Sequence, residues 1–218
     1  MSDAETFLQL TQALLDKTLS KEGLLNKVKK DFSLIPFLLD GVGSSKASVR
    51  YGCAKVLMDL SEQNPEKLYS HFDFFTKLLD SKYRIITWNA LAIIANLTRV
   101  DTNKKFDLIF DKYYGFLNNP YMVTVANVVG HSATIAQAKP YLIPRIVNHL
   151  LSVENISITP HLTEECKRVI AQKTITSINT FFDQVEQKEK VICFVKNHVN
   201  SPRESLNTVA ENFLDRWN

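Results

Sequence analysis

Apolar residues recur along most of the chain at the three- to four-residue spacing of amphipathic helices, and this pattern itself repeats. The segment SVRYGCAKVLMDL (48–60) can be set above IITWNALAIIANL (85–97), 37 residues later. The large apolar positions then coincide: Val49, Tyr51, Val56, Leu57 and Leu60 fall on Ile86, Trp88, Ile93, Ile94 and Leu97. A third, weaker copy lies in YMVTVANVVGHSATIA (121–136). A repeat of this length predicts a stack of similar helical units.

A shorter apolar segment precedes each of the three copies. These segments end alike, as LIPFLLD at Asp40, DFFTKLLD at Asp80 and DKYYGFLN at Asn118. Each unit is therefore predicted to be a pair of helices joined by a short turn. Two further pairs are predicted, YLIPRIVNHLL with TEECKRVIAQKTITSINTFF and KEKVICFVKNHV with SPRESLNTVAENFLDRW. Helices within residues 1–30 are expected to cover the open end of the stack, and residues 31–218 to form the repeats.

A helix in the middle of such a stack contacts its partner and both neighbouring units, so most of its surface is buried. The helix predicted over 85–97 fits this environment, because only a narrow strip of it is polar. Asn89, Ala92, Asn96 and Arg99 form that strip at spacings of three and four residues. Trp88 aligns with Tyr51 in the repeat and is predicted to be a core residue.

Helix-start signals appear at several points. Ser2 with Glu5, and Ser201 with Glu204, have the spacing of a capping box, and Pro202 suits a first helical position. Pro120 likewise suits the first turn of the third long helix. Capping signals near both ends favour a complete solenoid.

The composition is that of an ordinary folded protein, with 45% hydrophobic and 22% charged residues and a net charge of only +3. Acids and bases are mixed, which argues against a dedicated nucleic-acid binder. Cys53, Cys166 and Cys193 form no C-x-x-C pair and are predicted to be core thiols in a reducing compartment. No signal peptide and no apolar run of about 18 residues is present, so we expect a cytoplasmic protein with no membrane partner.

The segments RYGCAKVLMDL and TWNALAIIANL, with Ala54 and Ala90 as small packing residues and LLD endings before the turns, resemble the HEAT-repeat family of the armadillo-type helical superfamily. The resemblance covers about two thirds of the chain, and HEAT units are typically slightly longer than 37 residues. It implies an all-α, right-handed α-α superhelix, a solenoid of about five HEAT-like helix pairs with an N-terminal helical cap. Residues 1–218 would form this single domain.

The resemblance also implies where a partner would bind, because the second helices of successive units line the concave face in that family. The partner-binding residues predicted on this basis are Lys55, Asp59, Asn89, Asn96, Arg99, Asn127 and His131, flanked by Gly52, Glu62, Ala92 and Thr134. Such a surface is polar, mixed in charge and rich in amides, which suits a peptide backbone or a polar protein segment. We therefore expect a non-enzymatic scaffold or adaptor that binds another protein or a peptide, without a cofactor.

Motifs for catalysis or metal binding are weak. GVGSSK (41–46) has some features of a phosphate-binding loop, but it lacks the full G-x-x-x-x-G-K-[ST] spacing and follows a helix instead of a strand. The five histidines are too widely spaced for a local metal site. The insertion SVENISITPHLT (152–163) is a second candidate for function, since long loops often carry it.

The alternative hypothesis is a nucleic-acid-binding HEAT-like solenoid, including a DNA glycosylase-like protein that removes alkylated bases. Trp88 and the lysines at 27, 29, 30, 104, 105 and 112 would matter in that case. The weak basic balance favours the protein-binding hypothesis. Trp217 is expected to close the last core, since large aromatic side chains are mostly buried.

Overall fold

The computed structural model describes residues 3–217, so Ser2, one half of the predicted N-terminal capping box, lies outside the described residues. Within 3–217 the chain forms twelve α-helices and no β-strand beyond one isolated bridge between Thr159 and Leu162. The helices divide between two compact units, Met1–Asp101 and Thr102–Asn218, each with its own core. The prediction of one domain over 1–218 stays a prediction.

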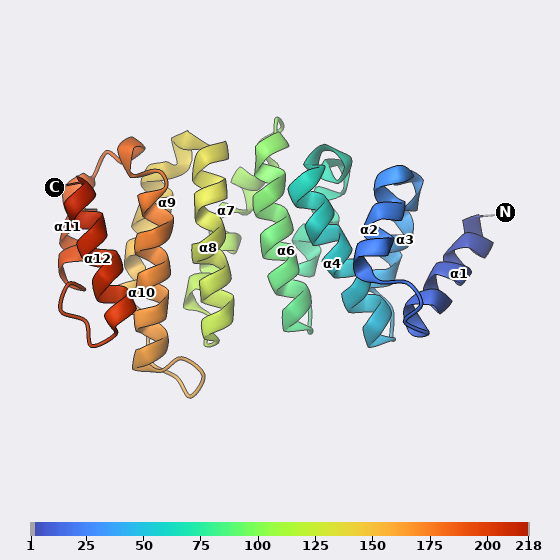
Figure 1. Ribbon diagram of the computed structural model, residues 1–218. Coiled ribbons are helices and arrows are strands. Elements are labelled where there is room, and N and C mark those ends of the chain that lie inside the picture. Colours follow the sequence, from blue (N-terminus) through green and yellow to red (C-terminus); the bar gives the residue numbers. More distant parts are fainter. Residues whose placement is uncertain (1–2, 218) are drawn as a thin grey trace. The chain divides into compact units, whose positions relative to one another are not determined.

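Unit 1 holds six helices in two layers. The helices are α1 (Asp3–Leu15), α2 (Lys21–Lys30), α3 (Ile35–Val42), α4 (Ala47–Gln63), α5 (Phe72–Leu78) and α6 (Arg84–Leu97). In one layer α2, α4 and α6 lie side by side, and the short helices α3 and α5 pack behind α4 and α6 (Figure 1). Helix α1 also packs on α4. The predicted helical cap and the first two helix pairs are thus present.

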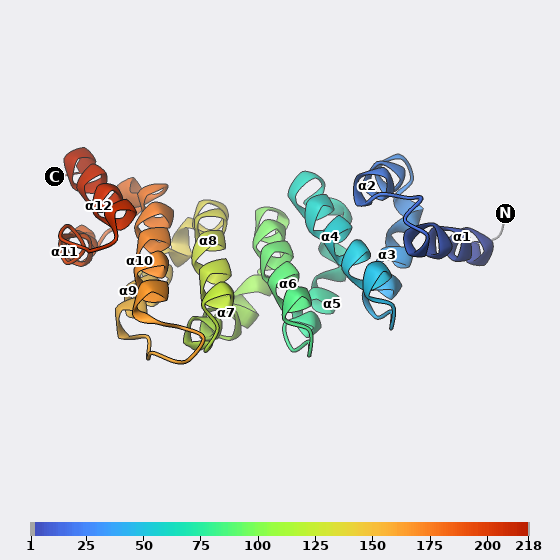
Figure 2. The ribbon, with the colours of Figure 1, turned by 60° about the horizontal axis from the view of Figure 1, so that its bottom comes forward.

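Unit 2 repeats this arrangement with three pairs. Its helices are α7 (Lys105–Gly115), α8 (Met122–Ala138), α9 (Ile143–Leu151), α10 (Glu164–Asn179), α11 (Lys188–Lys196) and α12 (Glu204–Trp217). The long helices α8, α10 and α12 form one layer, and α9 and α11 contact them from behind (Figure 2). The all-α solenoid of five helix pairs and a cap is confirmed.

Short 3₁₀ turns introduce most of the short helices, for example at Phe32–Leu34 before α3, Tyr69–His71 before α5 and Pro140–Leu142 before α9. Units of this kind therefore have three parts, a 3₁₀ turn, a short helix and a long helix.

Two predicted helix starts are wrong. Helix α8 begins at Met122, so Pro120 lies ahead of its first turn, where Asn119 accepts a hydrogen bond from the Tyr121 amide. Helix α12 begins at Glu204 instead of Pro202. The reason is local, because the Ser201 hydroxyl accepts from the Arg203 amide only two residues away and forms a turn in place of a helix cap.

The side chain of Arg50 holds the loop GVGSSK in its conformation. Its side chain is 6% exposed, and its guanidinium lies 3.9 Å from the Tyr83 ring and 4.7 Å from the Tyr51 ring. The Nη1 atom donates to the carbonyl oxygens of Ser44 and Ser45. The loop therefore presents carbonyl groups to an internal cation, the opposite of a phosphate-binding loop, in which amides face an anion.

Of the three cysteines, only Cys53 is a buried core residue. Burial raises the pKa of its thiol to about 12, so it stays protonated. Cys193 is exposed on α11, which contradicts its predicted place in the core. The nearby apolar residues Val191 and Phe194 are buried. Apolar neighbours in the sequence therefore indicate an amphipathic helix, but they do not show that Cys193 lies on its buried face.

Gly41 of α3 lies directly against Cys53 of α4. A Cβ atom at Gly41 would lie 2.4 Å from the Cys53 sulfur and 3.1 Å from its Cβ, so Gly41→Ala forces the two helices apart. We expect a loss of about 1–3 kcal/mol in the free energy of unfolding, measured by urea denaturation.

Gly115→Ala is the matched control, because a Cβ there meets nothing within 4 Å. It should leave stability unchanged or raise it by up to about 1 kcal/mol. Adding Cys53→Ala to Gly41→Ala should recover part of the loss. Equal stabilities for the two glycine variants would contradict the close packing of α3 on α4.

Candidate partner-binding surfaces

The first candidate surface, the unit 1 face, consists of the predicted residues on α4, on α6 and in the 3₁₀ turn Thr98–Val100 that follows α6: Lys55, Asp59, Asn89, Asn96 and Arg99. The two helices pack side by side, so these residues lie on neighbouring helices of one unit. Lys55 and Asp59 form an ion pair one turn apart along α4 and are both partly exposed. An exposed pair of this kind contributes little stability, so the two charges mainly satisfy each other on the surface of α4.

Asn96 and Arg99 link α6 to the end of α4. The Asn96 amide donates to the Ser61 hydroxyl at 3.0 Å. The Arg99 Nη2 donates to the carbonyl oxygens of Ser61 and Glu62 at 3.0 and 2.6 Å. Because the last carbonyls of a helix have no partner within it, Arg99 closes the C-terminal end of α4. These two side chains hold the repeat together, and their predicted role in binding stays untested.

Asn89 differs from them. It is partly buried, and its amide makes no hydrogen bond within residues 3–217. Ala92, one turn further along α6, was predicted on the same exposed strip but is only 4% exposed. The strip is therefore interrupted by a buried residue at this point. Trp88 is partly exposed beside Asn89, contrary to its prediction as a core residue. Asn89 is thus the residue of the unit 1 face with a free amide donor and acceptor.

The second candidate surface lies in unit 2, where α8 carries the predicted residues Asn127 and His131 and the flanking Thr134. All three are partly exposed. The Asn127 amide nitrogen donates to the Val123 carbonyl at 2.8 Å, which leaves its oxygen free. The pKa of His131 is lowered, first by burial and then by the nearby Lys173 ammonium on α10, so the imidazole is neutral at pH 7.

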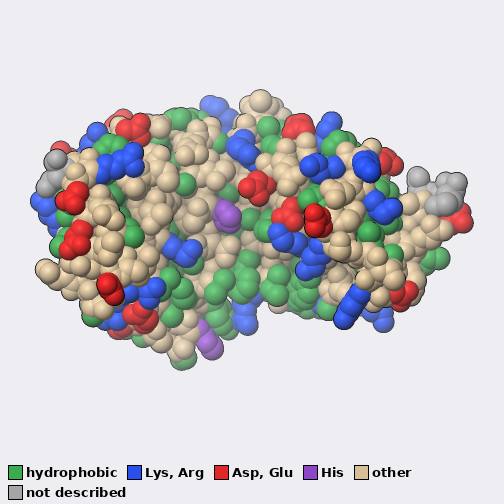
Figure 3. Space-filling view, in the orientation of Figure 1, with side chains coloured by type: hydrophobic (Ala, Val, Ile, Leu, Met, Phe, Trp, Pro, Cys, Tyr) green, Lys and Arg blue, Asp and Glu red, His purple; other side chains and the backbone are tan. Residues whose placement is uncertain are grey.

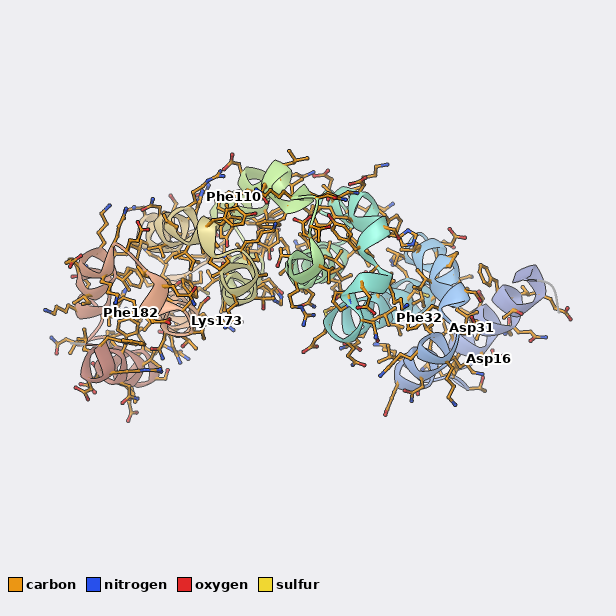
Figure 4. All side chains as sticks on the ribbon, turned by 90° about the horizontal axis from the view of Figure 1, so that it is seen from above. Asp16, Asp31, Phe32, Phe110, Lys173 and Phe182 are labelled. Atoms are coloured by element: carbon orange, nitrogen blue, oxygen red, sulfur yellow. The ribbon has the colours of Figure 1, made fainter. Side chains whose placement is uncertain are left out.

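A groove of about 510 Å³, which we call the unit 2 groove, opens along the same helix and α10, and Asn127, His131 and Thr134 are not among its lining residues. Its lining comes from α8, α10 and the turn before α12: Gly130, Ala133, Val169, Gln172, Lys173, Thr176, Ser177, Thr180 and Arg203. The hollow exists because α8 presents Gly130 and Ala133, which have little or no side chain, to the longer residues of α10. Lys173 is labelled on α10 in Figure 4.

Sequence reasoning missed the α10 half of this groove. Helix α8 begins at Met122 and α10 at Glu164, so equivalent positions are 42 residues apart and not 37. With that offset Asn127, His131 and Thr134 correspond to Val169, Lys173 and Thr176. The insertion at 152–163 lengthens the repeat interval between α8 and α10. Aligning the two helices with these extra residues taken into account would have identified the strip on α10 from the sequence.

The insertion at 152–163 is anchored. The Thr159 hydroxyl donates to the Pro120 carbonyl at 2.9 Å, and the His161 ring stacks on Tyr121 at 4.7 Å. Leu162 is fully buried. The segment therefore packs against the start of α8. Trp217 contacts the Phe182 ring at 5.1 Å and donates to Asn179, so it closes the last core as predicted.

Within the described residues no group of three His, Cys, Asp or Glu side chains is placed to hold a metal ion. Three of the histidines instead contact aromatic rings: His149 stacks on Tyr114, His161 stacks on Tyr121, and His198 meets Phe194 edge to face. No helix in residues 3–217 combines the length and apolar character needed to cross a membrane. On the face drawn in Figure 3, positive and negative side chains are interspersed, with mostly uncharged surface over α8 and α10.

Comparison with solved structures matches the chain to a designed armadillo repeat protein with a TM-score of 0.62 and 18% identity, over 100% of this chain and 95% of that one. The fold is an armadillo/HEAT-like helical repeat. A second designed armadillo repeat protein, in complex with peptide (KR)4, matches with a TM-score of 0.64 and 17% identity over 100% of both chains. An engineered protein matches with a TM-score of 0.57 and 15% identity over 99% of this chain and 96% of that one.

No protein-family model matches the chain, and no curated protein matches it significantly. At the low identities of the structural matches, the likeness shows the fold alone. The chemistry of the unit 1 face and the unit 2 groove therefore follows from their own side chains and not from these matches.

The proximity of Lys173 to His131 gives a prediction for titration. Because the ammonium disfavours the imidazolium, Lys173→Met should raise the pKa of His131 toward its ordinary value. NMR titration of the histidine ring protons measures this. The pKa of His149, which Asp111 and Arg145 influence instead, is the internal control and should not move. An unchanged pKa of His131 would place Lys173 away from it.

The Arg99 contacts give a second prediction. Arg99→Ala leaves the last carbonyls of α4 without their donor and should lower the free energy of unfolding by about 1 kcal/mol. Lys77→Ala removes an exposed cation of the same unit and should change stability by less than about 0.5 kcal/mol. Equal free energies of unfolding for the two variants would show that Arg99 does not stabilise the end of α4.

Proposed function

We propose that the protein is a non-enzymatic scaffold that binds another protein or a peptide segment on the exposed strips of its long helices. The observation that carries this proposal is the free amide of Asn89, which lies on a rigid helix packed against its neighbours and bonds to nothing within the described residues. A peptide backbone offers both a donor and an acceptor at each residue, which is what an amide side chain pairs with.

The unit 2 groove supports the same proposal. Its hydroxyl and amide groups lie along α10 at helical spacing, and on the neighbouring helix α8 the amide oxygen of Asn127 makes no hydrogen bond within the described residues. A groove walled by two packed helices is preformed, so binding a segment there costs little ordering of the protein. The peptide (KR)4 held by a designed armadillo repeat protein supports a peptide as the ligand class for a chain of this fold.

The test is selection of ligands without prior assumption about their sequence. Random dodecapeptides displayed on phage are panned against the immobilised full chain, and enriched peptides are resynthesised with a fluorophore. Their affinities are then measured by anisotropy for the wild type, for the Asn89→Ala/Asn127→Ala variant and for Asn148→Ala. Asn148 is an exposed amide on the short helix α9 and serves as the matched control.

We expect enriched peptides whose affinity falls about tenfold in the double variant, because one or two hydrogen bonds of roughly 1 kcal/mol each are lost. The Asn148→Ala variant should bind like the wild type. Absence of any enriched peptide, or equal loss in the control, would contradict the proposal.

Duplex and single-stranded DNA are tested in parallel at low and moderate salt. Phosphate contacts weaken steeply with salt, whereas amide contacts to a peptide do not. DNA binding tighter than that of any selected peptide, with a steep salt dependence, would replace the proposal by the nucleic-acid hypothesis.

A further inference from the structure

The lining of the unit 2 groove is one-sided in charge. Of its nine residues two are basic, Lys173 and Arg203, and none is acidic. The chain as a whole mixes acids and bases almost equally, with 23 acidic and 26 basic residues. A groove lined without a carboxylate is therefore a local departure from the chain's own average.

Lys173 is the clearest source of positive charge. It is exposed on α10 and forms no ion pair within residues 3–217. Its ammonium is near enough to His131 to lower the pKa of that imidazole. No carboxylate among the groove residues neutralises it, so the charge is presented to solvent and to whatever enters the groove.

Arg203 adds a second cation, which is ion-paired with Glu165 and is thereby held in a fixed orientation. Glu165 accepts from its Nη1, and the Gln172 amide oxygen accepts from its Nε at 3.1 Å. Gln172 is itself held by the Ser205 hydroxyl at 2.9 Å. The remaining Nη2 atom makes no hydrogen bond in the described chain. Such a preorganised guanidinium suits a carboxylate better than a flexible ammonium does.

Ser177 contributes an unusual group at the same place. Its side chain lines the groove, is 5% exposed and has a hydroxyl with no hydrogen-bond partner. Buried polar groups are nearly always paired in folded proteins. The hydroxyl oxygen is itself buried, so it is an unpaired donor within the wall of the groove.

From these observations we infer that the unit 2 groove binds an acidic peptide segment, with carboxylates paired to Lys173 and the free amino group of Arg203. This inference rests on the proposed scaffold function and specifies its ligand. A polyphosphate chain is disfavoured, because nucleic-acid binders neutralise many phosphates and this groove offers two cations. The charge is opposite to that needed for the basic peptide (KR)4 of the designed armadillo repeat protein.

The experiment uses the full chain and three labelled octapeptides of equal length, (Asp-Glu)4, (Lys-Arg)4 and (Ser-Gly)4, with a single-stranded DNA octamer as a fourth probe. Binding is measured by fluorescence anisotropy at low and moderate salt. The variants are Lys173→Glu and, as the matched control, Lys190→Glu on the short helix α11, which is equally exposed and makes the same charge change. Circular dichroism melting verifies that both variants fold.

The wild type should bind (Asp-Glu)4 more tightly than the other three probes. Lys173→Glu should weaken this binding about tenfold or more and improve binding of (Lys-Arg)4, while Lys190→Glu changes neither by more than about twofold. No binding of (Asp-Glu)4 at low salt, equal effects of the two variants, or tighter binding of the DNA octamer would overturn the inference.

Failure of this inference is distinguishable from failure of the scaffold function. If panning yields neutral or basic peptides whose affinity depends on Asn89 and Asn127, the scaffold function stands and the acidic ligand is wrong. If panning yields no peptide and (Asp-Glu)4 does not bind, both fail together.

Discussion

The structure depends on burying the middle long helix of each unit between neighbours on both sides. In unit 1 the helix α4 contacts α2 on one side and α6 on the other, with α3 behind it, and in unit 2 the helix α10 lies in the same way between α8 and α12. A single helix pair cannot bury both of its apolar faces, so the fold exists only as a stack. One consequence is that each long helix keeps one narrow strip for polar residues. Every polar group on that strip either links adjacent helices or is available to a ligand.

The two units use their strips differently. In unit 1 internal bonds occupy part of the strip, because Asn96 of α6 and Arg99 of the following 3₁₀ turn bond to the end of α4, and Lys55 and Asp59 pair with each other. Only Asn89 keeps a free amide. In unit 2 small residues on α8 open a groove, and Lys173 in its lining has no ion-pair partner within the described residues. The fold thus fixes where a ligand can bind, and the side chains on each strip decide its chemistry.

Much of this fold follows from the sequence, because the apolar positions of a buried helix are strongly constrained. The 37-residue step between Val49 and Ile86 located α4 and α6 within three residues of their ends. Helix ends are less constrained, and Ser201 shows why. Its hydroxyl can accept a hydrogen bond from an amide of the first helical turn or from the amide two residues later, and packing decides between them.

The candidate sites follow from the sequence only in part. Periodicity placed Asn89, Asn127 and His131 on exposed strips, but it could not show that Arg99 bonds to carbonyls 37 and 38 residues away. The α10 wall of the unit 2 groove was missed because the insertion at 152–163 changes the repeat interval from 37 to 42 residues. The unpaired hydroxyl of Ser177 has no sequence signal at all, since it depends on three-dimensional burial.

The most direct test of ligand binding on the long-helix strips is amide chemical-shift mapping of the ¹⁵N-labelled full chain during titration with (Asp-Glu)4. The account predicts that shifted amides cluster on α8, α10 and the turn before α12, with Gly130, Lys173 and Arg203 among them. Shifts confined to the short helices α7, α9 and α11, or no saturable shifts, would contradict it.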